Sequence, residues 1–253
     1  MQASVQAPPP VKPRVGFFVT CLVDLVRPEV GFAAIKLLEQ AGCEVDVPPA
    51  QTCCGQPGYN SGDAAVAREL AKQVLRTFEH FDYVVLPSGS CSATIRGDYP
   101  ELWTDDPDLR SRFDALAART YELTDFLVNV MQVRALESRF TGKLTYHDSC
   151  AGLRYLGVKD QPRRLLALVP SAQLTEMKDC QQCCGFGGTF SVKYGAISSA
   201  IVDDKCRNIR DSGAPVVAGG DLGCLLNIEG RLRRTGDDQT RVLHVAQILA
   251  GDA

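Results

Sequence analysis

The chain has 253 residues, a formal net charge of -3 and 45% hydrophobic residues, with a mean hydropathy of -0.06. This charge gives no general attraction to nucleic acids or acidic lipids, and the composition is that of an ordinary globular protein. We find no run of about 18 apolar residues, so we expect no transmembrane segment.

The cysteine content is high, at 11 residues. A disulfide framework is typical of short secreted chains, whereas this chain is long enough for an ample core and its cysteine count is odd. The apolar run over 15–19 is too short for a signal peptide and has no small-residue cleavage site after it. We therefore expect a cytoplasmic protein, in which clustered cysteines bind metal or carry out redox chemistry.

Residues 1–13 are expected to form a flexible tail, followed by the elements of an α/β unit. Short runs of β-branched and aromatic residues predict buried strands, and apolar residues at helical spacing predict helices. Gly42 should end the first long helix, and Ser61 or Asp63 should cap the next one. The expected elements are a strand over 15–21, a helix over 28–41, a strand over 44–47, a helix from about 61 to 81 and a strand over 83–87.

The later elements repeat this order after a segment without cysteines. Residues 99–140 are expected to be a helical connector, with a helix start near residues 105–108 and an apolar helix over 124–131. After it we expect a strand over 143–147, a helix over 162–168, a strand over 174–177, a helix over 192–212 and a strand over 215–219. A strand over 242–245 and a closing helix complete the chain.

The cysteines repeat together with these elements. Each unit reads Cys, then Cys-Cys-Gly, then Cys, at Cys21, Cys53-Cys54-Gly55 and Cys91, and again at Cys150, Cys183-Cys184-Gly185 and Cys224. Such self-similarity indicates two copies of one structural unit. We therefore predict an α/β protein with two pseudo-symmetric parallel-sheet halves, a first domain over 14–98 and a second over 141–253, whose Cys-Cys-Gly loops face a shared cleft.

The repeated cysteines lie where a parallel sheet binds its ligands. Such sheets hold ligands beyond the carboxyl ends of their strands, so three separate segments of each half should converge there. The glycine after each cysteine pair permits a turn that lets both thiols face one object. Four thiolates typically hold an iron–sulfur cluster. The pattern predicts one or two clusters, most simply [4Fe-4S], with the ligands Cys21, Cys53, Cys54, Cys91, Cys150, Cys183, Cys184 and Cys224.

Other roles for cysteine and histidine residues stay open at this point. Zinc also takes four cysteines, but its usual Cys-x-x-Cys spacing occurs only at Cys180 and Cys183, outside the repeated pattern. Cys43 and Cys206 are predicted to be buried as small apolar residues. His147 could tune or bind a cluster, but Phe18 stands at its counterpart, which favours a buried histidine with satisfied hydrogen bonds. No catalytic residue is predicted.

Several motifs of the chain occur together in a known family. These are Phe18-Val19-Thr20-Cys21, Cys53-Cys54-Gly55-Gln56-Pro57, Pro87-Ser88-Gly89-Ser90-Cys91 and Cys183-Cys184-Gly185-Phe186-Gly187-Gly188. With them the chain resembles the CCG cysteine-rich domain family, whose members include a component of heterodisulfide reductase and the iron–sulfur component of glycolate oxidase. The likeness is greatest to its lactate-utilisation branch and runs from about Val15 to about Leu249.

The resemblance implies an iron–sulfur electron-transfer component of a cytoplasmic three-protein system that oxidises L-lactate to pyruvate. Its partners would be a ferredoxin-type iron–sulfur protein and a third component, and the chain would be a redox subunit rather than a complete enzyme. The alternative is a metal-free scaffold or an organic-acid-binding subunit of the same complex.

The chain departs from the cluster-binding relatives at two positions. Those relatives end each unit with Cys-x-x-Cys, whereas Ser88 and Asp221 occupy the first of these positions here. Their oxygen atoms are poorer partners for iron–sulfur chemistry than thiolates. We expect a simpler four-cysteine cluster, more easily lost to oxygen, and side chains of Ser88 and Asp221 that point at the cysteines of their own half.

Overall fold

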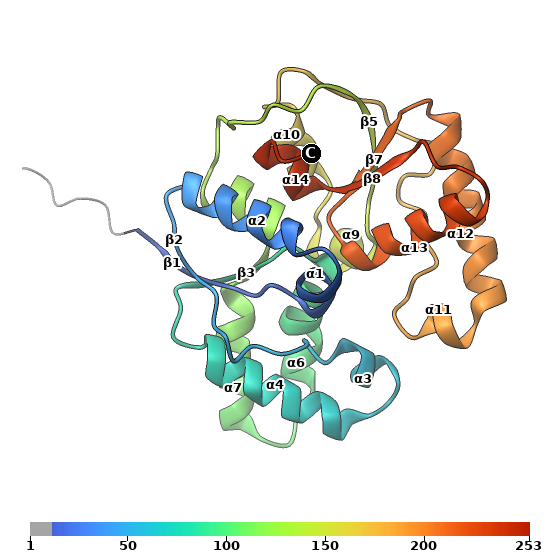
Figure 1. Ribbon diagram of the computed structural model, residues 1–253. Coiled ribbons are helices and arrows are strands. Elements are labelled where there is room, and N and C mark those ends of the chain that lie inside the picture. Colours follow the sequence, from blue (N-terminus) through green and yellow to red (C-terminus); the bar gives the residue numbers. More distant parts are fainter. Residues whose placement is uncertain (1–11) are drawn as a thin grey trace, which may run out of the picture.

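The computed structural model describes residues 12–253, so almost all of the predicted tail lies outside the described residues. Two four-stranded sheets have the strand orders β2-β1-β3-β4 and β6-β5-β7-β8, and every pairing in them is parallel. The two orders are equivalent position by position, with helices around both sheets (Figure 1). The predicted α/β fold with two equivalent parallel-sheet halves is therefore confirmed.

The first half contains four strands, and the predicted order of its elements holds. Asp63 rather than Ser61 caps α4, because its carboxylate accepts the Val66 N–H at 3.1 Å. The segment expected as a connector also supplies a strand, β4, which the sequence patterns missed. The elements are β1 (Arg14–Phe17), α1 (Cys21–Val26), α2 (Pro28–Gln40), β2 (Glu44–Asp46), α3 (Gln56–Asn60), α4 (Ala64–Phe78), β3 (Tyr83–Leu86), α5 (Gly89–Ala93), the π-helical turn η1 (Thr94–Asp98), α6 (Tyr99–Glu101), α7 (Pro107–Ala118), β4 (Thr120–Glu122), α8 (Leu123–Asp125) and the π-helical turn η2 (Phe126–Val130).

The second half repeats this order, with a short helix beyond those expected, α9, and two shifts from expectation. The strand expected over 174–177 lies slightly earlier, as β6, and the helix expected over 192–212 is divided at Tyr194 into α11 and α12. The elements are β5 (Gly142–His147), α9 (Cys150–Leu156), α10 (Asp160–Leu166), β6 (Ala172–Leu174), α11 (Phe190–Lys193), α12 (Gly195–Asp211), β7 (Val216–Gly219), α13 (Leu222–Arg234), β8 (Arg241–His244) and α14 (Val245–Ala250).

The two halves pack on each other through equivalent elements. Helix α5 contacts α9, and its counterpart α13 contacts α1. Helix α2 lies beside α14, so a blue helix and a red helix are neighbours in Figure 1. One hydrophobic core runs through both halves and includes Phe17, Leu38, Leu144 and Ile248. Within residues 12–253, no helix has the length and apolar character needed to cross a membrane.

Two side chains at equivalent positions, Glu122 and His244, lie at the interface between the halves. Each caps the helix after the last strand of its sheet: His244 accepts from the Ala246 N–H, and Glu122 Oε2 accepts from the N–H groups of Thr124 and Asp125. His244 Nε2 reaches the Pro87 carbonyl of the other half at 3.1 Å. Glu122 Oε1 is buried without a hydrogen-bond partner, in a small cavity that Tyr146 and Gly220 of the other half also line.

This environment makes Glu122 hard to ionise. Its side chain is almost fully buried, and desolvation by burial raises its pKa from 4.5 to about 7, with a smaller contribution from the charge of Asp125. The folded protein therefore retains a proton that the unfolded chain releases between these two pH values. As pH rises through this window the folded state loses stability, by an amount on the order of 3 kcal/mol.

Glu122→Gln should remove this pH dependence while its amide oxygen still caps α8. Urea unfolding of both proteins between pH 4.5 and 7.5 should show the variant gaining free energy of unfolding relative to the parent as pH rises, on the order of 3 kcal/mol across the window. A constant difference between the two proteins over this range would show that Glu122 ionises normally in the fold.

Candidate metal centres

The four repeated cysteines of the first half meet beyond the carboxyl ends of its strands. Cys21 is the first residue of α1, the Cys53–Cys54 pair follows β2, and Cys91 lies in α5 after β3. The Cys21 and Cys53 sulfurs are 3.7 Å apart, and the Cys54 and Cys91 sulfurs are 3.3 Å apart. All eleven cysteines are free thiols. The predicted convergence is thus present in this half.

The second half repeats the arrangement. Cys150 begins α9, the Cys183–Cys184 pair lies in the loop before α11, and Cys224 lies in α13 after β7. The sulfurs of Cys184 and Cys224 and one ring nitrogen of His147 all lie within 4.8 Å of one another. Cys150 and Cys183 line the same cavity, and the neighbouring Cys183 thiol raises the pKa of Cys150.

One thiol in each set is poised to be a thiolate. Hydrogen bonds from Cys21 and Cys54 lower the pKa of Cys53 to about 2, and those from Cys150 and Cys184 lower the pKa of Cys183 to about 2. The pKa values of the donating thiols are raised in return. A thiophilic metal displaces such shared protons, because only thiolates bind it.

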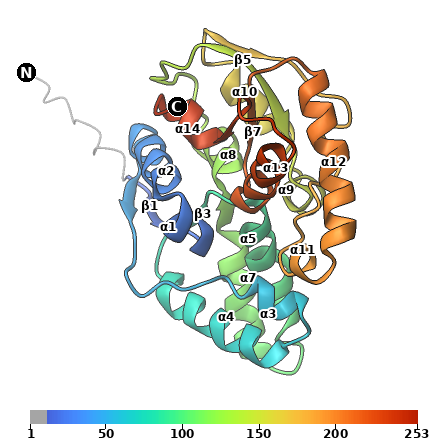
Figure 2. The ribbon, with the colours of Figure 1, turned by 45° about the vertical axis from the view of Figure 1, so that its right-hand side comes forward.

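Each set faces a cavity that the other half helps to close. The first set opens on a cavity of about 310 Å³, and residues of the second half that include Phe186, Thr189 and Val192 line it as well. The second set opens on a cavity of about 420 Å³ walled by residues of the first half that include Gln56, Tyr59 and Ser90. In Figure 2, α11 extends from the second half toward α3 of the first. Both Cys-Cys-Gly loops therefore face a shared cleft, as predicted.

The glycine of each Cys-Cys-Gly loop has a backbone that other residues rarely adopt. Gly55 has φ +78° and Gly185 has φ +81°. Their N–H groups turn back to donate to the Cys53 sulfur at 3.4 Å and the Cys183 sulfur at 3.3 Å. A Cβ atom at Gly185 would lie 2.6 Å from the Ser198 carbonyl oxygen, whereas one at Gly55 would lie 3.3 Å from the Leu70 side chain and 3.8 Å from the Ala67 Cα.

The expected orientation of Ser88 and Asp221 is only partly observed. Both line the cavity of their own half, but their side chains are bonded to each other: the Ser88 hydroxyl donates to Asp221 Oδ2 at 3.1 Å. The Ser90 N–H donates to the same oxygen at 2.8 Å. Ser88 also caps α5 and Asp221 caps α13. Repeat spacing cannot reveal this contact, because it joins two residues at equivalent positions of different halves.

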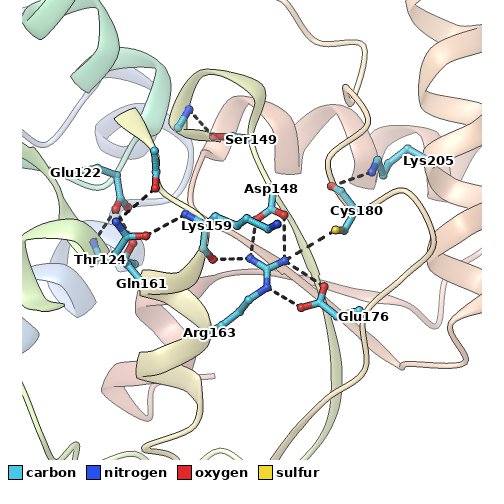
Figure 3. Close-up of polar contacts among 12 residues, drawn as sticks. Glu122, Thr124, Asp148, Ser149, Lys159, Gln161, Arg163, Glu176, Cys180 and Lys205 are labelled. Carbon is cyan, nitrogen blue, oxygen red and sulfur yellow. Dashed lines mark hydrogen bonds and ion pairs between the residues drawn. The ribbon is translucent and has the colours of Figure 1, made fainter. Parts of the chain in front are cut away.

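Ion pairs hold the loop that carries the second set. Arg163 donates to both oxygens of the buried Asp148 carboxylate, at 2.8 and 2.9 Å, and to those of Glu176 at 2.6 and 3.1 Å (Figure 3). The buried Lys205 ammonium donates to the Asp179 and Cys180 carbonyls, at 2.7 and 3.2 Å. Sequence spacing had not indicated Asp148, Arg163 or Lys205.

Cysteines outside the repeated set have other surroundings. Cys43 and Cys206 are buried in the apolar cores, as predicted. Cys180 is half-buried, and its sulfur lies 3.9 Å from the Arg163 guanidinium. His147 differs from expectation: it is buried, but neither ring nitrogen has a hydrogen-bond partner. Burial lowers its pKa to about 3, so the ring is neutral at pH 7.

Alanine substitutions at Gly55 and Gly185 should distinguish the energetic cost of a left-handed backbone from the cost of steric overlap. Gly55→Ala should lower the free energy of unfolding by about 1–2 kcal/mol, the cost of a left-handed alanine. Gly185→Ala should lose about 1–3 kcal/mol more, because its Cβ overlaps a carbonyl oxygen. Urea unfolding of the metal-free protein measures both. Equal losses would mean that the loop at Gly185 shifts without cost.

The comparisons with known proteins agree with this geometry. The sequence model of the CCG family, a cysteine-rich domain, matches residues 15–96 and 144–229. Lactate utilization protein A of Geobacillus kaustophilus is 51% identical over 236 residues, which cover 93% of this chain and 98% of that protein. Its namesake in Bacillus subtilis is 48% identical with the same coverage.

A solved structure also has this fold. A hypothetical protein from Helicobacter pylori aligns with a TM-score of 0.60 at 13% sequence identity, over 97% of this chain and 50% of that one. Both matches of the family model carry a complete Cys…Cys-Cys-Gly…Cys set, and the relatives match nearly end to end. The chain therefore belongs to the CCG cysteine-rich domain family, among relatives named lactate utilization protein A.

Proposed function

We propose that this protein is an iron–sulfur electron-transfer component of a cytoplasmic system that oxidises L-lactate to pyruvate. The role in lactate utilisation follows from relatives about 50% identical along nearly the whole chain. The observation that carries the redox role is the convergence of four unbridged thiols in each half. The eight proposed ligands are Cys21, Cys53, Cys54, Cys91, Cys150, Cys183, Cys184 and Cys224.

The residues present fit such a group. In the first half the sulfurs lie in hydrogen-bonded pairs, and in each half all four line one cavity, where a metal could replace their protons. The glycine after each pair leaves space beside the sulfurs. A bound cluster would supply one-electron redox chemistry. The chain's own contribution is to hold the thiolates in position and to cover them with the opposite half.

The lining of the cavities favours electron transfer over binding of an organic acid. Among the described residues that line the two cysteine cavities, none is a lysine or an arginine, and the Asp221 carboxylate faces both. A carboxylate such as lactate is normally held by a cationic side chain, most often arginine. We therefore propose that lactate is oxidised on a partner subunit and that only electrons reach this chain.

Removal of one thiol from one half should remove about half of the iron. Protein purified and reconstituted without oxygen should be brown, from thiolate-to-iron charge transfer. Cys54→Ser should abolish binding in the first half and Cys184→Ser in the second, because serine oxygen is a poor ligand for iron–sulfur clusters. Each single variant should retain about half of the iron and sulfide per chain, and the double variant almost none.

The matched control is Cys180→Ser, which changes a half-buried cysteine next to the second set but outside the repeat. It should keep the full iron and sulfide content. Colourless parent protein after reconstitution would instead support the metal-free scaffold. Loss of iron in Cys180→Ser but not in Cys184→Ser would show that the second ligand set is wrong.

A further inference from the structure

His147 is a buried side chain beside the cysteines, and neither of its two polar atoms is accounted for. Its exposed fraction is 1%, and neither Nδ1 nor Nε2 has a hydrogen-bond partner. Leaving a buried polar atom unpaired costs about 1–3 kcal/mol. One ring nitrogen lies within 4.8 Å of the sulfurs of both Cys184 and Cys224. His147 therefore places an unpaired ring nitrogen next to the second cysteine set.

The Cys180 backbone lies close enough to the ring to act on the His147 pKa, which it raises, but it forms no well-aligned hydrogen bond with either nitrogen. The Cys180 carbonyl near the ring already accepts from the Asp148 N–H at 3.2 Å and from the Lys205 ammonium at 3.2 Å, which uses both of its lone pairs. His244 provides the contrast. It is buried to the same degree, and each of its ring nitrogens has a partner.

The first half has no equivalent group. Phe18 stands at the matching position and packs in the apolar core, with its ring 5.3 Å from that of Phe78. The two cysteine sets are thus alike in their thiols and differ in the residue beside them. In the first half a phenyl ring fills this position and packs against the core. Packing alone therefore does not explain why the second half has an imidazole there.

We propose that the His147 imidazole is a metal ligand in the second half, together with the thiolates of Cys184 and Cys224. Ligand atoms of a tetrahedral site with bonds of about 2.0–2.3 Å lie about 3.5 Å apart, so small side-chain movements would complete the site. Mixed imidazole and thiolate ligation is well suited to iron, zinc and cobalt. That the metal is the iron of a cluster rests on the proposed function, whereas the ligand assignment does not.

Cobalt(II) tests the ligand assignment without a cluster. The background carries Cys21→Ser and Cys53→Ser, which leave the first half without two thiols. In it, His147→Phe, which imitates Phe18, should weaken cobalt binding at least tenfold and shift the visible ligand-field bands. His147→Cys restores a ligand and should bind cobalt with an all-sulfur spectrum. His80→Gln alters an exposed histidine that lines neither cysteine cavity and should change nothing.

The iron-loaded full-length protein gives the second measurement. Protein labelled with ¹⁵N-histidine, reconstituted and reduced without oxygen, should show strong ¹⁵N hyperfine coupling in pulsed EPR. The coupling should disappear in His147→Phe and persist in His80→Gln. Circular dichroism should show that the variants remain folded, and His147→Cys gives the comparison if His147→Phe is unstable.

The outcomes separate this inference from the proposed function. If no cluster forms but cobalt binding depends on His147, the proposed function fails and the ligand assignment stands. If a cluster forms, its spectrum shows no histidine nitrogen, and cobalt binding is the same with and without the imidazole, the ligand assignment is overturned and the proposed function stands. If the cobalt spectrum and affinity are unchanged by His147→Phe and no cluster forms, both are rejected.

Discussion

The contact between the turns at Ser88 and Asp221 fixes where both cysteine sets lie. Each turn connects the third strand of its half in chain order to the helix that carries the last cysteine. The two turns are joined by the hydrogen bond between Ser88 and Asp221 and by that from the Gly89 N–H to the Gly220 carbonyl. Because strand ends in a parallel sheet gather at one edge, joining the halves at these turns brings both edges to one cleft.

As a consequence of this arrangement, each half helps to shield the cysteine set of the other. All the proposed thiolate ligands of a set come from one half, whereas part of the cavity wall that faces them comes from the other. Without the other half, each set would lose that part of its cover. The stability of each half also depends on the other, because residues such as Phe17 and Ile248 are buried in a hydrophobic core that both halves share. The duplicated unit thus functions as a pair.

The pair is symmetric in backbone and asymmetric in electrostatics. The buried face of α4 is wholly apolar, whereas that of α12 includes the Lys205 ammonium. With His147 replacing Phe18, the second half has a neutral imidazole and a cation where the first has hydrocarbon. A neutral imidazole adds no negative charge beside the thiolates, and a nearby cation favours the reduced form of an iron–sulfur centre, so both raise its reduction potential. A centre in the second half would therefore be the better electron acceptor.

The sequence by itself determined the duplication, the parallel α/β fold and the eight cysteines that converge, because strand runs, helix caps and cysteine spacing are local signals. It also indicated the turn at Gly55 and Gly185, since glycine tolerates a left-handed backbone. Only the tertiary structure decided which groups meet across the chain. It paired Ser88 with Asp221, made β4 part of the first sheet, and left His147 without the hydrogen bonds that its sequence context had suggested. These contacts depend on the packing of one half against the other or of distant loops against a strand, and no local pattern encodes that geometry.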